Sequence, residues 1–354
     1  MEDLVNNFES NDDLEEVEDA PIDPLQITKE DYEISKIIKY WQETHMFHKT
    51  FTCPKCSTIM KLEKSNQYMD NYVFRCRSKQ PNHDIKINIR SESSFENIKI
   101  KLNVIHYLIF YCFIGRKSIS KSYSAIKKFC EILGEPLTST NTIIKLYQLL
   151  RNLIKKYYHY QWDNSLLGIE PAEGGVSRIE IDESEIIGKN DKILWMFGLI
   201  DRANKEARVF CVMDNRRKEN ILPIIKNNVY TPDVNEENED MKTRIYSDCF
   251  SVYQENYFLN KGYKLHRVNH SVWFGQGLFN TNTVEGLWAT IKRLNGNFSG
   301  ITFKTLEKLE SNGITSKDYL NDWICYSLFL RDCDKNKYDE SQSREYLVKI
   351  LKIN

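Results

Sequence analysis

The segment Ser177–Gly188, which reads SRIEIDESEIIG, constrains the fold of this chain more than any other stretch. A short apolar run there ends in a carboxylate, Asp182, and Glu183 and Glu185 follow at once. A buried strand that delivers an acid at its C-terminal end is typical of the functional edge of an open α/β sheet. The segment therefore predicts an α/β domain whose chemistry depends on acidic side chains.

An α/β pattern continues after this segment. Three expected strands follow one another, and later strands alternate with helices, which predicts a mixed sheet with helices on its faces. The expected strands are Val176–Ile181, Ile193–Ile200, Ala207–Met213, Arg244–Tyr246 and Lys264–Val268. The expected helices are Glu219–Asn228, Phe250–Leu259 and Thr283–Leu294, and two terminal helices, Thr315–Leu330 and Arg344–Leu351, are expected to pack against this domain.

Two further acids occur where such a sheet would bring them to Asp182. Asp248 follows the fourth expected strand, and Glu285 begins the helix after the fifth. Adjacent first and fourth strands would place the two Asp residues together, with Glu285 beside them. Such a trio can hold two divalent ions about 3.5–4 Å apart, the arrangement that cleaves phosphodiesters, because Mg²⁺ prefers carboxylate oxygens. The acids that compete for this role are Glu180, Asp201 and Asp214.

The segment around Glu285 adds candidate substrate-binding residues. Lys292 lies seven residues, or two helical turns, after Glu285, and so on the same helix face. There it would contact a DNA phosphate, although a solvated basic helix edge explains it equally simply. His270 is a candidate for orienting a carboxylate or a phosphate, and the alternative is a structural hydrogen-bonding role.

The CPKC sequence upstream has the spacing of a metal knuckle. Two thiolates three residues apart on a tight turn can bind one zinc ion. Cys53 and Cys56 form this pair, Cys76 follows after a hairpin-sized gap, and His83 is the nearest later donor. These four residues are the predicted zinc ligands. The alternatives are His48 as the fourth ligand, or three cysteines without metal.

Helices are expected on both sides of the knuckle. Lys29–His48 predicts a short helix, and Ile98–Ile114, Ser118–Leu133 and Thr138–Tyr160 predict three more, which suit a helix-turn-helix unit that binds DNA. An equally acceptable interpretation is a bundle that only links two domains. The basic side chains expected to coat these helices are Lys117, Lys121, Lys127, Lys128, Lys145, Arg151, Lys155 and Lys156.

Charge is distributed unevenly along the 354 residues. Residues 1–33 carry 13 Asp or Glu and one Lys, so a net charge of −1 hides a body with +11. A basic body attracts phosphates, and an acidic leader can moderate that attraction or merely add solubility. Nine cysteines with one CxxC fit a reducing compartment. No apolar run is long enough for a membrane span and the N-terminus has no secretory pattern, so we expect a nuclear protein in a eukaryote and otherwise a cytoplasmic one.

The order of motifs resembles the Merlin superfamily of DNA transposases and its bacterial insertion-sequence relatives. The resemblance covers roughly residues 50–300 and is carried by CPKC, INIRSESSFENIKIKL, IEIDES, WMFGLIDR, YSDCFSVY and TNTVEGLWATIKR. It implies a ribonuclease H-like catalytic domain with Asp182, Asp248 and Glu285 as its Asp-Asp-Glu triad. Two departures are His83, where a fourth cysteine is usual, and a short segment after Gly188.

The resemblance implies an enzyme, a cut-and-paste DNA transposase. Mg²⁺ or Mn²⁺ would bind at the triad and Zn²⁺ at the ribbon, and the partners would be transposon ends and target DNA, bridged by a homodimer or larger assembly. The expected organisation is an acidic disordered leader (1–28), a short helix (29–50), a zinc ribbon (51–92), a helical region (93–167), the catalytic domain (168–310) and C-terminal helices (311–354).

Two other functions fit the same residues. One is a host-retained, sequence-specific DNA-binding protein that no longer needs catalysis. The other is a ribonuclease H-like nuclease that cleaves RNA–DNA hybrids.

Overall fold

The computed structural model describes residues 28–79, 82–169, 176–189, 192–213, 216–231, 242–268, 280–294 and 301–352. Two compact units divide the chain: one holds the residues up to Leu153 together with those from Lys337 onward, and the other holds Ile154–Asn336. Most of the acidic leader, His270 and Asp214 lie outside the described residues, so the predictions made for them stay predictions. No helix among the described residues has the length and apolarity needed to cross a membrane.

The first unit combines a small sheet with helices. Strands β1 (Lys61–Lys64), β2 (Tyr72–Lys79) and β3 (Asn82–Asn88) form an antiparallel sheet in that order. Around it lie α2 (Ile34–Glu43), α3 (Leu102–Tyr107) with a π-helical continuation η2 (Leu108–Phe113), α4 (Ile119–Leu133) and the first part of α5 (Thr140–Asp163). The last helix, α11 (Glu340–Leu351), also belongs to this unit.

A buried ion pair joins the small sheet to the start of α3. Arg90 donates from Nε to Asp70 at 2.6 Å and from Nη1 to the carbonyl of Ile98 at 2.7 Å. Asp70 also accepts from the backbone N–H of Leu102 at 2.9 Å. Each side chain is only 3% exposed, so these bonds replace the water that both charges lose on burial.

The second unit is built on a five-stranded mixed sheet with the order β6-β5-β4-β7-β8. Strands β4 (Arg178–Lys189), β5 (Lys192–Asp201) and β6 (Ala207–Met213) are antiparallel neighbours, whereas β7 (Thr243–Ser247) and β8 (Tyr263–Arg267) run parallel to β4. The order places the first strand in the centre of the sheet. The mixed sheet predicted from the alternating pattern is therefore confirmed.

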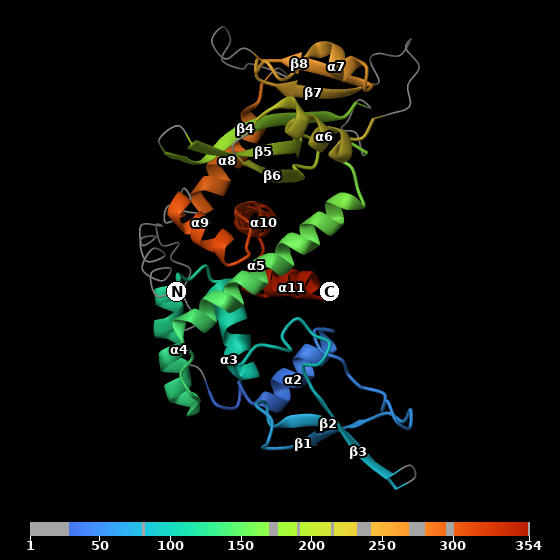
Figure 1. Ribbon diagram of the computed structural model, residues 1–354, viewed down its shortest axis with the longest axis vertical. Helices are drawn as coiled ribbons and strands as arrows, with labels where there is room; N and C mark the ends of the chain where they lie inside the picture. The colour runs from blue at the N-terminus through green and yellow to red at the C-terminus, as the bar shows by residue number, and fades with distance from the viewer. Residues whose placement is uncertain are drawn as a thin grey trace. The chain divides into compact units, whose positions relative to one another are not determined.

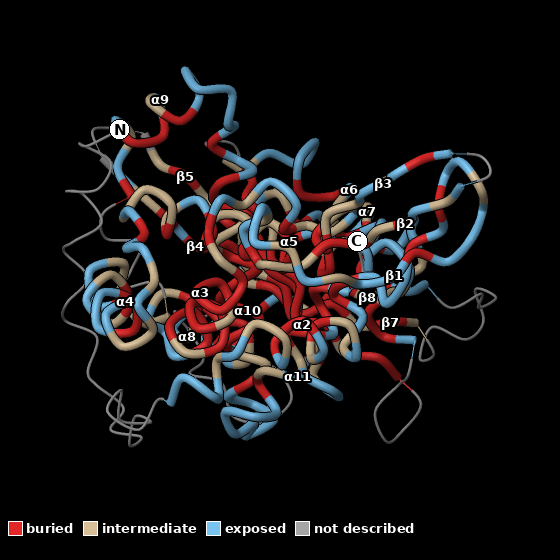
Figure 2. Tube along the Cα trace, turned by 90° about the horizontal axis from the view of Figure 1, so that it is seen from below, coloured by how far each residue is buried: buried red, intermediate tan, exposed pale blue. Residues whose placement is uncertain are grey.

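Helices cover both faces of this sheet (Figure 1). One face carries the apolar core, in which Ile179, Ile181 and Ile245 pack against α6 (Lys218–Asn228) and against Phe258 of α7 (Glu255–Leu259). The opposite face contacts α8 (Asn282–Leu294) and α10 (Ser316–Lys335). Figure 2 shows α10 buried along most of its length, whereas α4 in the first unit exposes one side. Odd-numbered residues of β4 therefore face the core, and even-numbered ones face α8.

Several boundaries differ from the predicted ones. Strand β4 does not end at Asp182 but continues to Lys189, with a bulge between Glu185 and Ile187. Its parallel pairing with β7, however, stops at Glu180 and Tyr246. Asp182 thus lies two residues past the last residue of β4 that pairs with β7, in a part of β4 that still pairs with β5. Helix α9 (Phe303–Ser311) had not been predicted.

Two expectations about packing are wrong. The helix that starts near Arg344 does not join the sheet domain but belongs to the first unit, where its apolar side chains are buried. Arg151 and Lys155 are not part of a solvated basic coat, since both are buried. Lys155 pairs with Asp322 at 2.8 Å and with Asp318 at 3.2 Å on α10, because the part of α5 that enters the second unit is covered.

Candidate functional site

Four predicted metal ligands converge at the base of the small sheet. Cys53 and Cys56 stand on the turn before β1, while Cys76 on β2 and His83 on β3 come from paired strands. One ligand atom from each residue lies within 4.8 Å of all the others. Antiparallel pairing explains the convergence, because Cys76 and His83 end up two register positions apart on adjacent strands.

The spacing of these four atoms suits zinc. Sγ of Cys56 lies 3.5 Å from Sγ of Cys76, and Nε2 of His83 lies 3.3 Å from Cys76 and 3.4 Å from Cys53. Tetrahedral zinc with ordinary bond lengths separates its ligand atoms by about 3.5–3.8 Å. A hydrogen bond from Thr58 lowers the pKa of Cys56 to about 6, which favours the thiolate that metals bind. The group can therefore hold a zinc ion. His48 is not part of it and instead pairs with Glu92 at 3.2 Å.

Asp182 and Asp248 lie equally far past the paired part of two neighbouring parallel strands. The register pairs Arg178 with Arg244 and ends at Glu180 with Tyr246, and each acid follows two residues after this last pair. Both acids therefore belong to the same end of the β4–β7 pairing. Asp248 lies in the turn after β7, where its carboxylate also accepts the backbone N–H of Phe250 at 2.9 Å.

Helix α8 brings Glu285 to the same strand. The backbone N–H of Val284 donates to Glu180 at 2.9 Å, and Arg202 donates to the other oxygen of that carboxylate at 2.6 Å. Glu180 is fully buried, so it fastens α8 to β4 and is not free to act as a ligand. Glu285 is exposed in the first turn of the helix, and Thr281 donates to it at 2.9 Å.

The three acids influence one another electrostatically. Burial raises the pKa of Asp182 to about 6, a hydrogen bond from Trp288 opposes the rise, and repulsion from Asp248 and Glu285 adds to it. A bound cation would relieve this repulsion. The three acids are spread more widely than the zinc ligands, because the Cys₃His group is the one set among the described residues that meets the 4.8 Å limit.

A fourth acid lies on the other face of β4. Glu183 is buried and accepts a hydrogen bond from the hydroxyl of Tyr253. Burial raises the pKa of Glu183 to about 7. Arg216 lies 4.0 Å away and stacks on the rings of Trp195 and Phe250. The neighbouring acid in the DES sequence is therefore separated from Asp182 by the sheet itself.

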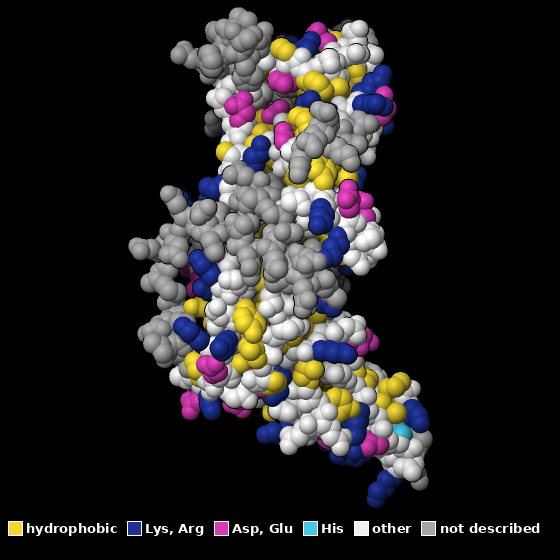
Figure 3. Space-filling model, turned by 60° about the vertical axis from the view of Figure 1, so that its left-hand side comes forward, with side chains coloured by type: hydrophobic (Ala, Val, Ile, Leu, Met, Phe, Trp, Pro, Cys, Tyr) yellow, Lys and Arg dark blue, Asp and Glu magenta, His cyan; other side chains and the backbone are white. Residues whose placement is uncertain are grey.

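The remaining predicted acids and bases have simpler positions. Asp201 is buried and caps a turn, accepting from the backbone of Ala203 at 2.8 Å and of Gly168 at 3.1 Å. Lys292 is partly exposed on α8. On the face drawn in Figure 3, Lys and Arg side chains are scattered and form no single large patch.

Sequence reasoning did not assign a role to Trp288 or Arg202. Trp288 donates from its indole N–H to Asp182 at 2.8 Å, and Arg202 neutralises Glu180 and stacks on Tyr246. A signal was present, because Trp288 lies one helical turn after Glu285 and Arg202 follows the second strand of the same domain. What the sequence does not show is which side chain each of them reaches.

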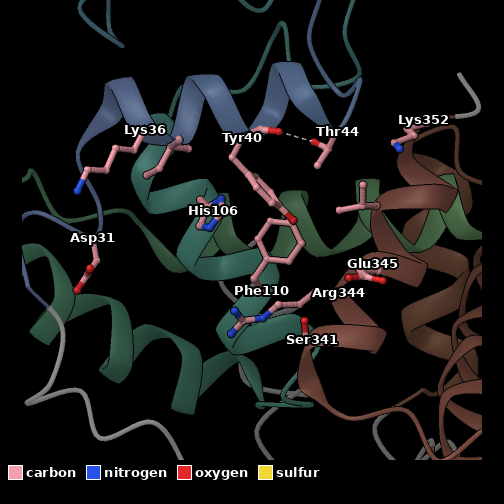
Figure 4. A pocket seen from close by; sticks show the side chains of 12 residues that line it. Asp31, Lys36, Tyr40, Thr44, His106, Phe110, Ser341, Arg344, Glu345 and Lys352 are labelled. Carbon is pink, nitrogen blue, oxygen red and sulfur yellow. Dashed lines mark hydrogen bonds between the residues drawn. The ribbon is translucent and has the colours of Figure 1, made fainter.

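The first unit also contains a cavity of about 660 Å³. Figure 4 shows Tyr40, His106 and Phe110 at its floor, with Arg344 and Glu345 contributed by α11. The indole of Trp41 donates to Nδ1 of His106 at 2.9 Å. Among the described residues, the lining of this cavity includes no group of three or more side chains placed to hold a metal ion.

Comparison with known proteins adds no assignment. No model of a known protein family matches the chain, and a search of curated proteins finds no matching sequence.

Proposed function

We propose that this protein is a DNA transposase of the Asp-Asp-Glu type, with Asp182, Asp248 and Glu285 as its catalytic acids. The observation that supports the proposal is the parallel pairing of β4 with β7, because Asp182 and Asp248 each follow two residues after its last pair, Glu180 with Tyr246. A third predicted acid comes from the helix that is hydrogen-bonded to the first of these strands.

The strand order supports a ribonuclease H-like domain. In that domain three antiparallel strands are followed by two strands parallel to the first, which is the order seen here. The motif resemblance to the Merlin superfamily supports the same assignment. The fold alone does not determine a reaction, so the acids carry the functional argument.

The acids suit a pair of hard cations. Held by Asp182, Asp248 and Glu285, two Mg²⁺ ions would activate an oxygen nucleophile and stabilise the leaving oxygen of a phosphodiester. Two ions do not need all of their ligands in one coordination shell. The three carboxylates can therefore lie further apart than the ligands of a single-ion site. Lys292, two turns from Glu285, would contact a substrate phosphate, and His270 is proposed to assist in substrate placement.

The first unit would bind the transposon ends. Its Cys₃His group can hold the zinc ion of a ribbon, and α4 presents the exposed lysines Lys121, Lys127 and Lys128. We propose that the helices after the ribbon act as the helix-turn-helix-like part of this DNA-binding region. The reaction would take place on two ends at once, in a homodimer or larger assembly.

Strand cleavage tests the proposal. The purified protein is incubated with duplexes that carry the inverted repeats flanking its gene, in Mg²⁺ or Mn²⁺. We expect nicking at the repeat ends by the wild type and a loss of at least about 100-fold in Asp182→Asn, Asp248→Asn and Glu285→Gln. Glu183→Gln is the matched control, because this acid lies next to Asp182 but on the other face of the sheet.

A second candidate is a DNA-binding protein that does not need catalysis. The ligand atoms of the Cys₃His group lie within 4.8 Å of one another, whereas the three acids do not form such a group. This difference favours a role in DNA binding over a role in catalysis. The same duplexes separate the two functions. Specific binding by both the wild type and the triple-acid variant, with no cleavage by either, would support the second candidate and reject the first.

A further inference from the structure

We propose that Trp288 is a positioning residue that holds the carboxylate of Asp182 in the orientation needed to bind a divalent cation, and that Gly198 exists to seat its indole ring. This inference rests on the proposed function, since it concerns the same acid. It adds a residue and a mechanism of orientation that neither the motif nor the triad specifies.

The hydrogen bond engages one oxygen of the carboxylate. Nε1 of Trp288 donates to Oδ2 of Asp182 at 2.8 Å, and the ring is only 6% exposed. An indole N–H is a donor without lone pairs, so it cannot itself compete for a metal ion. The bond to Oδ2 restricts rotation of the carboxylate and leaves lone pairs on its oxygens that can bind a cation. The carboxylate is therefore presented in one orientation in place of a freely rotating group.

Gly198 supplies the space for the ring. It lies directly opposite Asp182 in the antiparallel pairing of β4 with β5. A Cβ at Gly198 would come within 2.9 Å of Cζ2 of Trp288 and closer still to Cη2, a distance that atoms of a packed ring do not tolerate. A glycine inside a strand weakens the strand and commonly marks the close approach of another group. Here that group is the indole that reaches Asp182.

The helix that carries Trp288 is held in place independently. Val284 donates its backbone N–H to the buried carboxylate of Glu180, which Arg202 neutralises. Trp288 is one turn further along, so this anchor fixes the stretch of backbone from which the indole reaches Asp182. The anchored helix thus sets the position of Glu285 and the orientation of Asp182 together.

Outer residues that orient a metal ligand are worth about 10- to 100-fold in metal affinity. We therefore expect Trp288→Phe, which keeps a ring but loses the donor, to weaken Mn²⁺ binding by at least about 10-fold. Gly198→Ala should do the same although Trp288 is present, because its methyl group displaces the ring. The matched control is Gly286→Ala on α8, where an added Cβ meets nothing within 4 Å.

The experiment is a Mn²⁺ titration of the full-length, zinc-loaded protein, followed by electron paramagnetic resonance of the free ion. Thermal unfolding of each variant is measured in parallel to confirm that it is folded. The double variant Trp288→Phe with Gly198→Ala is included, since the smaller ring should accept the methyl group and bind Mn²⁺ no more weakly than Trp288→Phe alone. Where cleavage is measurable, Trp288→Phe should lower kcat and leave KM for DNA unchanged.

The outcomes separate this inference from the proposed function. If the Asp182→Asn variant binds Mn²⁺ as tightly as the wild-type protein, the metal site of the proposed function is rejected. If binding depends on Asp182 but folded Trp288→Phe and Gly198→Ala bind Mn²⁺ as tightly as Gly286→Ala, the positioning role is overturned while the metal site stands.

Discussion

At the scale of single residues, Asp182 shows what it costs in stability to bury an ionisable acid. Burial, with help from two neighbouring acids, raises its pKa to about 6, whereas an unfolded chain would ionise it near its ordinary value. An acid whose folded pKa is raised costs stability when it ionises. The cost is absent below pH 4 and grows as the pH rises from 4 to 6.

Asp182→Asn is therefore expected to stabilise the protein at neutral pH. In metal-free buffer at pH 7.5 the free energy of unfolding should increase by roughly 1–2 kcal/mol, discounted from the full shift because the carboxylate is partly exposed. Denaturant unfolding at pH 7.5 and pH 4 measures the effect, which should disappear at the lower pH. An equal gain at both pH values would contradict an ionisation effect.

His106 provides the opposite pH dependence in the first unit. Burial lowers its pKa to about 3, and the indole of Trp41 donates to its Nδ1, so the folded protein holds it neutral. A histidine with a depressed pKa supports full stability above its unfolded pKa of about 6.5 and loses it as the pH falls below that value.

His106→Gln tests this dependence. Between pH 7.5 and pH 5 the wild type should lose roughly 1–2 kcal/mol more stability than the variant, because only in the wild type does the unfolded chain take up a proton at residue 106 that the folded protein excludes. Chemical denaturation at both pH values gives the two differences. Identical losses would show that His106 does not contribute, and His45→Gln, which alters an exposed histidine of the same unit, serves as the control.

At the scale of elements, the small sheet depends on its ligand cluster. The strand β1 has four residues and is mostly exposed, and β3 buries little apart from His83. A segment with so small a core commonly takes much of its folding free energy from metal. The buried pair of Arg90 and Asp70 ties the sheet to α3, but it does not shape the hairpins themselves.

Removal of zinc should unfold this sheet without unfolding the second unit. After chelation, amide hydrogen exchange should accelerate in β1, β2 and β3, while β4 and β5 keep their protection. His83→Asn should lower zinc affinity by at least about 100-fold and reproduce the chelated state. His48→Asn is the control, because this nearby histidine pairs with Glu92. Equal losses in the two variants would contradict the ligand assignment.

At the scale of the whole molecule, the end of the chain returns to the first unit. Helix α11 begins with a capping box formed by Asp339 and Gln342, and it buries Leu347 and Leu351. The second unit is therefore inserted, in the order of the sequence, between two parts of the first. The first unit therefore depends on residues that lie on both sides of the second unit in the sequence.

Truncation after Asn336 is expected to weaken the first unit selectively. Loss of α11 removes the buried Leu347 and Leu351 and opens the cavity wall that Arg344 and Val348 provide, at a cost of several kcal/mol. Hydrogen exchange should accelerate in α2 and α3 but not in β4–β8. Unchanged protection in α2 and α3, or equal loss in both units, would show that α11 is not part of this unit.

The sequence by itself determined the elements whose cause is local. Apolar runs predicted the five strands of the mixed sheet, although β4 continues to Lys189, well past its predicted end at Ile181. Ser118 predicted the start of α4 that its side chain caps, and the CxxC spacing predicted two of the cluster ligands. It also predicted that the first and fourth strands are neighbours, because only adjacent strands would bring together the two acids that follow them. The strand order confirms that β4 and β7 are neighbours.

Only the tertiary structure decided the contacts between distant residues. It separated Glu180, neutralised by Arg202 and bound to α8, from Asp182 two residues later. It buried Lys155 against α10, returned α11 to the first unit, and set Trp288 over Gly198. Local patterns report which face of an element is apolar, whereas the partner of each polar side chain depends on which elements pack together. Which elements pack together depends on how the whole chain buries its apolar surface, and no single segment determines it.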